Sequence, residues 1–185
     1  IILAKSCHDL DIMRWLIDKP CKVISAEGSL HLFKKENMPE GAPFRCTDGC
    51  PYEAECPFSA MDVYLRRKKH LGVFDLKNRN DDAEILEKLR TTGYGRCVFQ
   101  CDNDQPDHYV TTMLFEEDKT ATFTMDAFTP WGGRRTRVMG TKGYIEGDMS
   151  IFTAWDFKTG KTKIWSREVE ELEEYKGAGH GGGDL

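Results

Sequence analysis

A histidine near the start of the chain has neighbours suited to proton transfer. His8 is followed by Asp11 three residues later and by Trp15 seven residues later. In a helix these three side chains share one face, because residues three, four and seven apart align along its surface. An imidazole beside a carboxylate exchanges protons near neutral pH, which makes His8 a candidate acid/base. The alternative is that His8 is only a satisfied histidine at a helix start.

A cysteine-rich loop is the second group of reactive side chains. Cys46, Cys50 and Cys56 follow a C-x3-C-x5-C spacing, which matches no standard iron–sulfur run. Tight turns converge such thiolates on one point, and thiolates select zinc as the default ion. Structural zinc normally has four ligands, and the sequence does not rank the candidates for the fourth. These candidates are Cys7, Cys21, His31 and His70. Alternatively, the three cysteines are reduced thiols in a polar loop or include one disulfide.

Hydrophobic spacing predicts the elements that position these groups. Ser6 and Asp9 have the spacing of a capping box, which predicts a helix from Ser6 to the Lys19-Pro20 pair. Two further helices are predicted, at 59–70 and from Asp81 to the glycines that follow Thr91. Period-two patterns and short apolar runs predict the strands. The predicted strands are 1–4, 23–33, 97–101, 109–116, 120–128, 136–139, 144–146, 151–155 and 163–165.

The connections between the later strands predict the fold class. They are short and contain glycines, whereas a parallel crossover needs a dozen or more residues, so consecutive strands must be antiparallel. The predicted architecture is therefore α+β, with one broad, mainly antiparallel open sheet and helices packed on one face.

The composition limits the class of protein. A chain of 185 residues with 39% hydrophobic residues predicts one folded domain covering 1–185. A net charge of −5 argues against a nucleic-acid partner, and no apolar run is long enough for a membrane span. Seven scattered cysteines fit the cytoplasm better than a secreted disulfide framework. The chain begins in mid-strand without a methionine, so we expect an excised piece of a longer protein.

Several segments resemble one enzyme family. AKSCHDLDIMRWL is similar to the segment that opens the C-terminal domain of the Gfo/Idh/MocA oxidoreductases. The resemblance continues through CKVISAEGSLHLF, RRTRVMGTKGYIEGD and GHGGGDL, and so covers nearly the whole chain. It implies that 1–185 is a substrate-binding and dimerisation domain that forms a homodimer through its sheet. It also implies that a missing N-terminal domain binds NAD or NADP.

The resemblance assigns roles to individual residues. In the family, the histidine that matches His8 lies where the nicotinamide meets the substrate and is a usual acid/base candidate. The implied reaction moves a hydride between NAD(P) and a hydroxyl-bearing carbon of a sugar or polyol, with His8 and Lys5 as catalytic residues. Further substrate contacts are expected from Asp11, His108 and His180. Many relatives carry an aspartate four residues before this histidine, whereas this chain has Ala4.

Other functions stay open at this point. Loss of that aspartate leaves room for an NAD-dependent glycoside hydrolase of the same family, and the domain alone could instead be a non-catalytic interaction module. The glycines at 177, 179 and 182 match G-x-G-x-x-G, but an acidic stretch precedes them in place of a buried strand, so they are not a dinucleotide fingerprint. For 177–185 the alternative to a substrate contact is a disordered glycine tail.

Overall fold

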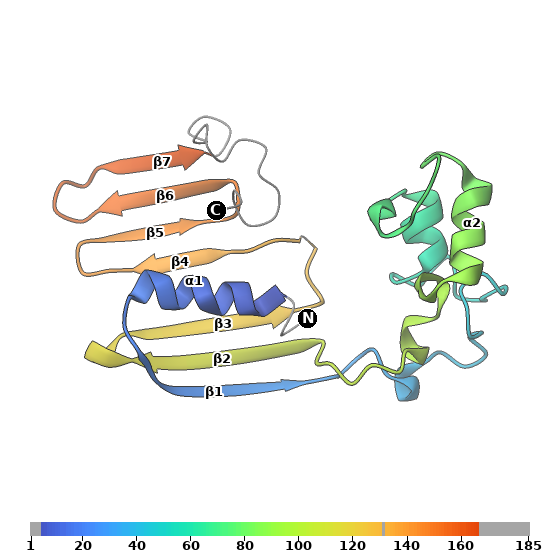
Figure 1. Cartoon of the computed structure of the whole chain (residues 1–185), viewed down its shortest axis with the longest axis horizontal. Helices are drawn as coiled ribbons and strands as arrows, with labels where there is room; N and C mark the ends of the chain where they lie inside the picture. Colours follow the sequence, from blue (N-terminus) through green and yellow to red (C-terminus); the bar gives the residue numbers. More distant parts are fainter. Residues whose placement is uncertain (1–4, 131, 167–185) are drawn as a thin grey trace. The chain divides into compact units, whose positions relative to one another are not determined.

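The computed structural model describes residues 5–130 and 132–166 and contains two compact units, Ile1–Ala127 and Phe128–Leu185 (Figure 1). The first unit contains a three-stranded sheet in the order β1-β2-β3, and the second a four-stranded sheet in the order β4-β5-β6-β7. The α+β class is confirmed, but the prediction of one broad sheet is wrong. The connection 127–135 contains a proline and two glycines and is too long for a tight hairpin, so the antiparallel pairing stops at each end of it. Strand 1–4 and tail 177–185 lie outside the described residues.

The sheet of the first unit carries helix α1 (Cys7–Ile17). Its strands are β1 (Cys21–Ser29), β2 (His108–Phe115) and β3 (Thr120–Asp126), all antiparallel. Along β2, buried residues alternate with more exposed ones, as a sheet with one covered face requires. The buried residues are Tyr109, Thr111, Met113 and Phe115.

Two local predictions for this unit are wrong. Ser6 precedes α1 but its side chain makes no cap hydrogen bond, because the Ser6 hydroxyl accepts from the Tyr109 hydroxyl instead. The predicted capping box is therefore replaced by an anchor between the helix start and β2. The sequence predicts that strand β1 buries one face, yet every residue in it is exposed, since α1 packs against β3 and is anchored to β2 and does not cover β1.

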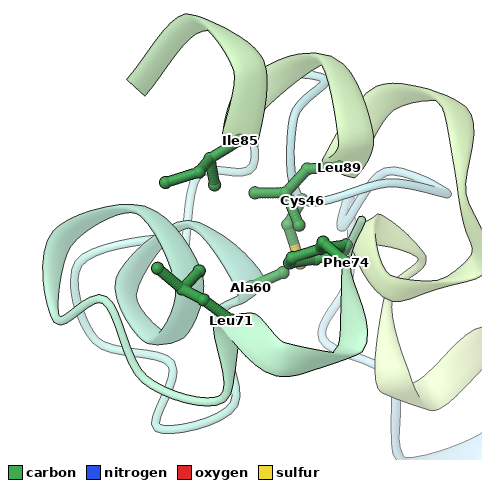
Figure 2. Packing of buried hydrophobic residues seen from close by; sticks show 6 residues of the cluster. All are labelled: Cys46, Ala60, Leu71, Phe74, Ile85 and Leu89. Carbon is green, nitrogen blue, oxygen red and sulfur yellow. The ribbon is translucent and has the colours of Figure 1, made fainter. Parts of the chain in front are cut away.

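A helical lobe of residues 30–107 separates β1 from β2 in the sequence. Its main elements are the π-helical segment η3 (Met61–Arg66) and helix α2 (Asp82–Thr91), whose N-cap Asp81 accepts hydrogen bonds from two backbone amides. The short 3₁₀ turns of the described chain are η2 (Lys35–Asn37), η4 (Leu71–Val73), η5 (Gly93–Gly95), η6 (Val98–Gln100) and η7 (Glu116–Asp118). Six buried side chains of the lobe form its core (Figure 2). They are Cys46, Ala60, Leu71, Phe74, Ile85 and Leu89.

The lobe departs from the sequence prediction in two places. The helix predicted at 59–70 covers only η3, because Lys68 and His70 adopt left-handed backbone conformations that end it. The strand predicted at 97–101 is the 3₁₀ turn η6, closed by a hydrogen bond from Gln100 N to Cys97 O. Alternate spacing of Cys97, Phe99 and Cys101 was therefore not evidence of a strand.

The second unit is a four-stranded meander. Its strands are β4 (Thr136–Met139), β5 (Gly143–Gly147), β6 (Ile151–Asp156) and β7 (Thr162–Ser166), which confirms the four strands predicted here. Gly143 is required by close approach, since a Cβ there would lie 2.4 Å from the Trp155 carbonyl oxygen. Within the described residues, no helix is long and apolar enough to cross a membrane.

Candidate functional site

The predicted catalytic residues lie at the start of α1. Lys5 precedes the helix, His8 is its second residue, and both side chains are exposed. Ser6, between them, is buried and hydrogen-bonded to buried Tyr109 of β2. The His8 imidazole therefore projects from a helix start that is fixed on the sheet, and it is open to exchange a proton with a molecule bound there.

An apolar surface adjoins His8 along the same helix. Asp11 is exposed one turn further on, and Ile12 and Trp15 follow His8 at positions that align along a helix. The Trp15 side chain is 75% exposed, which is unusual for so large an apolar group. This part of α1 is therefore an exposed apolar surface beside His8.

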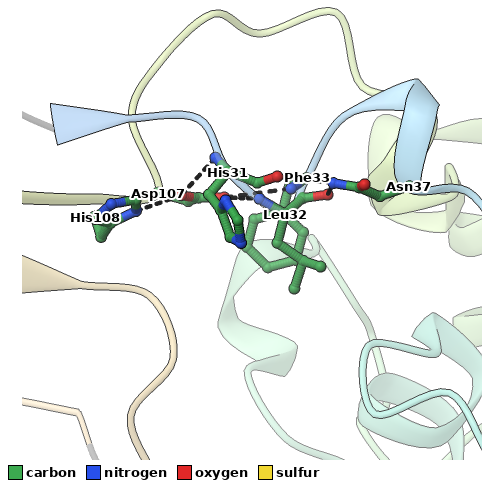
Figure 3. Close-up of polar contacts among 6 residues, drawn as sticks. All are labelled: His31, Leu32, Phe33, Asn37, Asp107 and His108. Carbon is green, nitrogen blue, oxygen red and sulfur yellow. Dashed lines mark hydrogen bonds and ion pairs between the residues drawn. The ribbon is translucent and has the colours of Figure 1, made fainter.

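The predicted substrate residue His108 lies elsewhere on the sheet. Because side chains alternate along β2 and Tyr109 faces α1, His108 points to the opposite face. Its Nδ1 lies 3.0 Å from an Asp107 carboxylate oxygen, and the His31 ring lies edge-on to it at 6.1 Å between centroids (Figure 3). The structure thus brings His108 to His31 rather than to His8. His180 lies outside the described residues.

Asp107 is the last residue of the helical lobe, directly before β2, and it contacts the first residues after β1. We call this junction of residues 30–33 and 107 the neck of the lobe. The Asp107 carboxylate, 3% exposed, accepts the backbone N–H groups of His31 at 2.9 Å, Leu32 at 2.7 Å and Phe33 at 3.3 Å (Figure 3). Burial by itself would raise the pKa of this carboxyl, but the three amides and His108 outweigh it and hold the pKa well below its usual range. Residues 102–107 are almost all polar, and nothing in the sequence distinguishes Asp107 from its neighbours.

Four cysteines of the helical lobe line one small cavity of about 20 Å³, which we call the cysteine cavity. Its cysteines are Cys46, Cys50, Cys56 and Cys97. The three predicted ligands are thus joined by Cys97, and not by any of the four residues that the sequence offered as a fourth ligand. All seven cysteines of the chain are free thiols. Among residues 5–130 and 132–166, no group of three or more histidine, cysteine or acidic side chains is placed so that it could hold a metal ion as it stands.

Two of these thiols are protonated more strongly than an ordinary cysteine. Burial raises the pKa of Cys46 and of Cys97, and this outweighs the backbone amides of Ala60 and Phe99, which act in the other direction. Negative charge on Cys50 or Cys56 would raise the pKa of both thiols further, as expected where four sulfurs line one cavity. No local pattern in the sequence points to Cys97 as a fourth member of this group, because only the folded lobe places it beside Cys46.

A second cavity, larger than the cysteine cavity, lies in the second unit. It is an open depression of about 740 Å³ at the ends of β4, β5, β6 and β7, lined by Val138, Ile145, Lys161 and Lys163 among others. None of the predicted site residues lines it.

Comparison with known proteins gives a distant relative. Over 191 residues the chain is 23% identical to a protein of Bacillus subtilis (strain 168) named "Putative oxidoreductase YteT". The match covers 97% of this chain and 43% of that protein, so the chain spans less than half the length of the curated relative it matches. No protein-family model matches the chain, and neither does a solved structure. The chain is therefore a distant homologue of a protein named as an oxidoreductase, and membership of the Gfo/Idh/MocA family stays a prediction.

Proposed function

We propose that this chain is the substrate-binding part of an NAD(P)-dependent oxidoreductase of the Gfo/Idh/MocA type. The observation that carries the proposal is the position of His8, exposed on a helix start that Ser6 and Tyr109 fix to the sheet. The similarity to a protein named as an oxidoreductase supports the same class. That protein is more than twice as long as the matched region, which is consistent with a cofactor domain outside this chain.

The proposed reaction oxidises a secondary alcohol of a sugar or polyol to a ketone. The carbon loses a hydride and the hydroxyl loses a proton, so the C–H electron pair leaves the substrate as a C=O bond forms. Bound NAD or NADP would accept the hydride. His8 would take the hydroxyl proton, and the ammonium of Lys5 would stabilise the negative charge that develops on the substrate oxygen. Asp11, on the same exposed side of α1, would accept a hydrogen bond from a neighbouring hydroxyl.

Assays on the full-length protein that contains this chain test the proposal. We expect NAD⁺ or NADP⁺ to be reduced in the presence of a member of a sugar and polyol panel, measured by the absorbance of the reduced nicotinamide. Failure of the protein to bind either nucleotide in calorimetry would rule out the class. Quantifying the organic product beside the reduced nicotinamide then gives the net redox change.

A glycoside hydrolase of the same family is the second candidate function. Ala4 stands where many relatives of the predicted family have an aspartate, so the usual acid/base pair is incomplete. A hydrolase would release two sugars per turnover and accumulate no reduced nicotinamide, although activity would still need the bound nucleotide. The product analysis above separates the two reactions.

We also propose a homodimer formed through the sheet of the second unit. Met139 and Ile164 lie on one face of this sheet, with exposed fractions of 78% and 62%. Substitution Ile164→Lys is expected to shift a dimer toward monomer, measured by sedimentation velocity, because it places a charge on an apolar interface. Lys158→Glu, in the exposed turn after β6, is the control and should not change the oligomeric state. A wild-type chain that sediments as a monomer would contradict this proposal.

A further inference from the structure

We propose that the cysteine cavity is a structural zinc site with four thiolate ligands. The ligands are Cys46, Cys50, Cys56 and Cys97. This site is separate from the α1 surface around His8, and the proposal does not rest on the oxidoreductase function.

Backbone pairing places Cys46 and Cys97 beside each other. Arg45 and Arg96 form an isolated antiparallel bridge. On either side of it, Cys46 N donates to Gly95 O at 2.9 Å and Cys97 N donates to Phe44 O at 2.9 Å. The two cysteines are therefore diagonal neighbours on the same face of this short ladder, and both line the cysteine cavity. Two thiols that face one small cavity in this way can both bind an ion placed between them.

Tight turns bring the other two cysteines to the same cavity. The chain from Cys46 to Cys50 is a turn in which Gly49 has a φ of +76°, a conformation that favours glycine. A second turn follows, closed by a hydrogen bond from Cys56 N to Tyr52 O at 2.8 Å. Since the turns are short and hydrogen-bonded, the three predicted ligands are held near one point without a long loop to order.

The size of the cavity selects a single ion. About 20 Å³ accommodates one ion or one water molecule, but not the several iron and sulfide atoms of a cluster. The thiols as they stand are not yet in ligand positions. Rotation of a cysteine between two staggered rotamers moves its sulfur by about 3 Å. The proposal therefore requires the four side chains to rotate into the cavity when zinc binds, with zinc–sulfur distances of about 2.3 Å. Each thiol releases its proton when it becomes a ligand.

Four thiolates leave no open coordination position, so the ion would have a structural role. It would join the segment 46–59 to the segment that follows α2, and these segments surround a core of only six buried side chains. A bound metal ion would raise the folding stability of a lobe with so small a core, because metal-binding free energy adds directly to folding free energy.

Elemental analysis and thiol labelling of the whole 185-residue chain test the proposal. After reduction and titration with zinc, we expect about one tightly bound zinc per chain. Zinc should protect the four ligand thiols from iodoacetamide, as mapped by mass spectrometry, whereas Cys7, Cys21 and Cys101 should react with or without zinc. Cobalt in place of zinc should give the thiolate charge-transfer and d–d bands of a tetrahedral four-sulfur site.

Matched cysteine variants locate the fourth ligand. Cys97→Ser should lower zinc affinity more than about a hundredfold, since outer-shell changes alone cost about 10- to 100-fold. Cys101→Ser, four residues away, should bind zinc as the wild type does. Absence of zinc binding by the folded wild-type chain would overturn the proposal, and so would a protected set that omits Cys97. Because labelling uses the wild type, the test holds even if Cys97→Ser fails to fold.

Discussion

Replacing His8 by alanine is expected to lower the turnover of the full-length protein by about a hundred- to ten-thousand-fold, the usual contribution of a general acid/base. His8 is exposed and is not part of the core, so the fold should be retained. If His8 handles the hydroxyl proton, kcat should fall while the dissociation constant of the nucleotide stays unchanged. Steady-state kinetics with the substrate found by the panel assay, and calorimetry with NAD or NADP, measure the two quantities.

Two variants control for losses unrelated to proton transfer. His8→Gln keeps a polar side chain that can hydrogen-bond but cannot exchange a proton near neutral pH, so it should be nearly as impaired as His8→Ala. His70→Asn changes an exposed histidine in the helical lobe, and asparagine tolerates the left-handed backbone found there. That variant should retain full activity. Wild-type turnover in His8→Ala would refute the role of His8 in proton transfer. The oxidoreductase class would then be tested only by the quantification of organic product and reduced nicotinamide.

Local patterns in the sequence predicted most of the regular elements. The alternation in β2 and β3 and the glycine turns around β4 to β7 identify strands directly, because period-two burial and tight turns are local properties. Helix α2 is likewise signalled by Asp81, whose side chain does cap the helix as expected of an aspartate before an apolar run. These elements needed no tertiary information.

The predictions for Ser6 and Cys97 failed because each residue forms a hydrogen bond with a residue that is distant in the sequence. Ser6 has the spacing of a helix cap, but its hydroxyl oxygen instead accepts a hydrogen bond from the Tyr109 hydroxyl, which is more than a hundred positions away. The spacing of Cys97 predicts a strand, whereas a hydrogen bond from Cys97 N to Phe44 O holds it where its side chain lines the cysteine cavity. Both contacts join segments that are remote in sequence, so no local pattern contains them.

Substitution of Asp107 by alanine is expected to destabilise the first unit by about 3 kcal/mol, because three backbone amides lose a buried carboxylate partner. These amides belong to His31, Leu32 and Phe33, at the exit from β1. Urea unfolding followed by circular dichroism measures the loss. Hydrogen exchange at the three amides, resolved by NMR, should accelerate more than exchange in α2, since the neck of the lobe opens first.

Two further variants separate the carboxylate from a general effect of mutation. Asp107→Asn keeps one acceptor oxygen, so it should lose about half as much stability as Asp107→Ala. Asp104→Ala, in the exposed turn just before it, should change the free energy of unfolding by less than about 0.5 kcal/mol. Equal stabilities of Asp104→Ala and Asp107→Ala would show that the carboxylate does not hold the neck together.

The Asp107 pKa also sets how the stability depends on pH. The folded-state pKa lies below the unfolded value of about 3.9, so the carboxylate stabilises the fold fully above the unfolded pKa. This contribution declines as the pH falls below about 4, where the unfolded chain binds one more proton than the folded chain. The wild type should then lose up to about 1.4 kcal/mol per pH unit that Asp107→Asn does not lose. The free energies of unfolding of the two proteins should therefore converge in acid. A constant difference between them from pH 7 to pH 3 would show that the ionised Asp107 carboxylate does not stabilise the neck of the lobe.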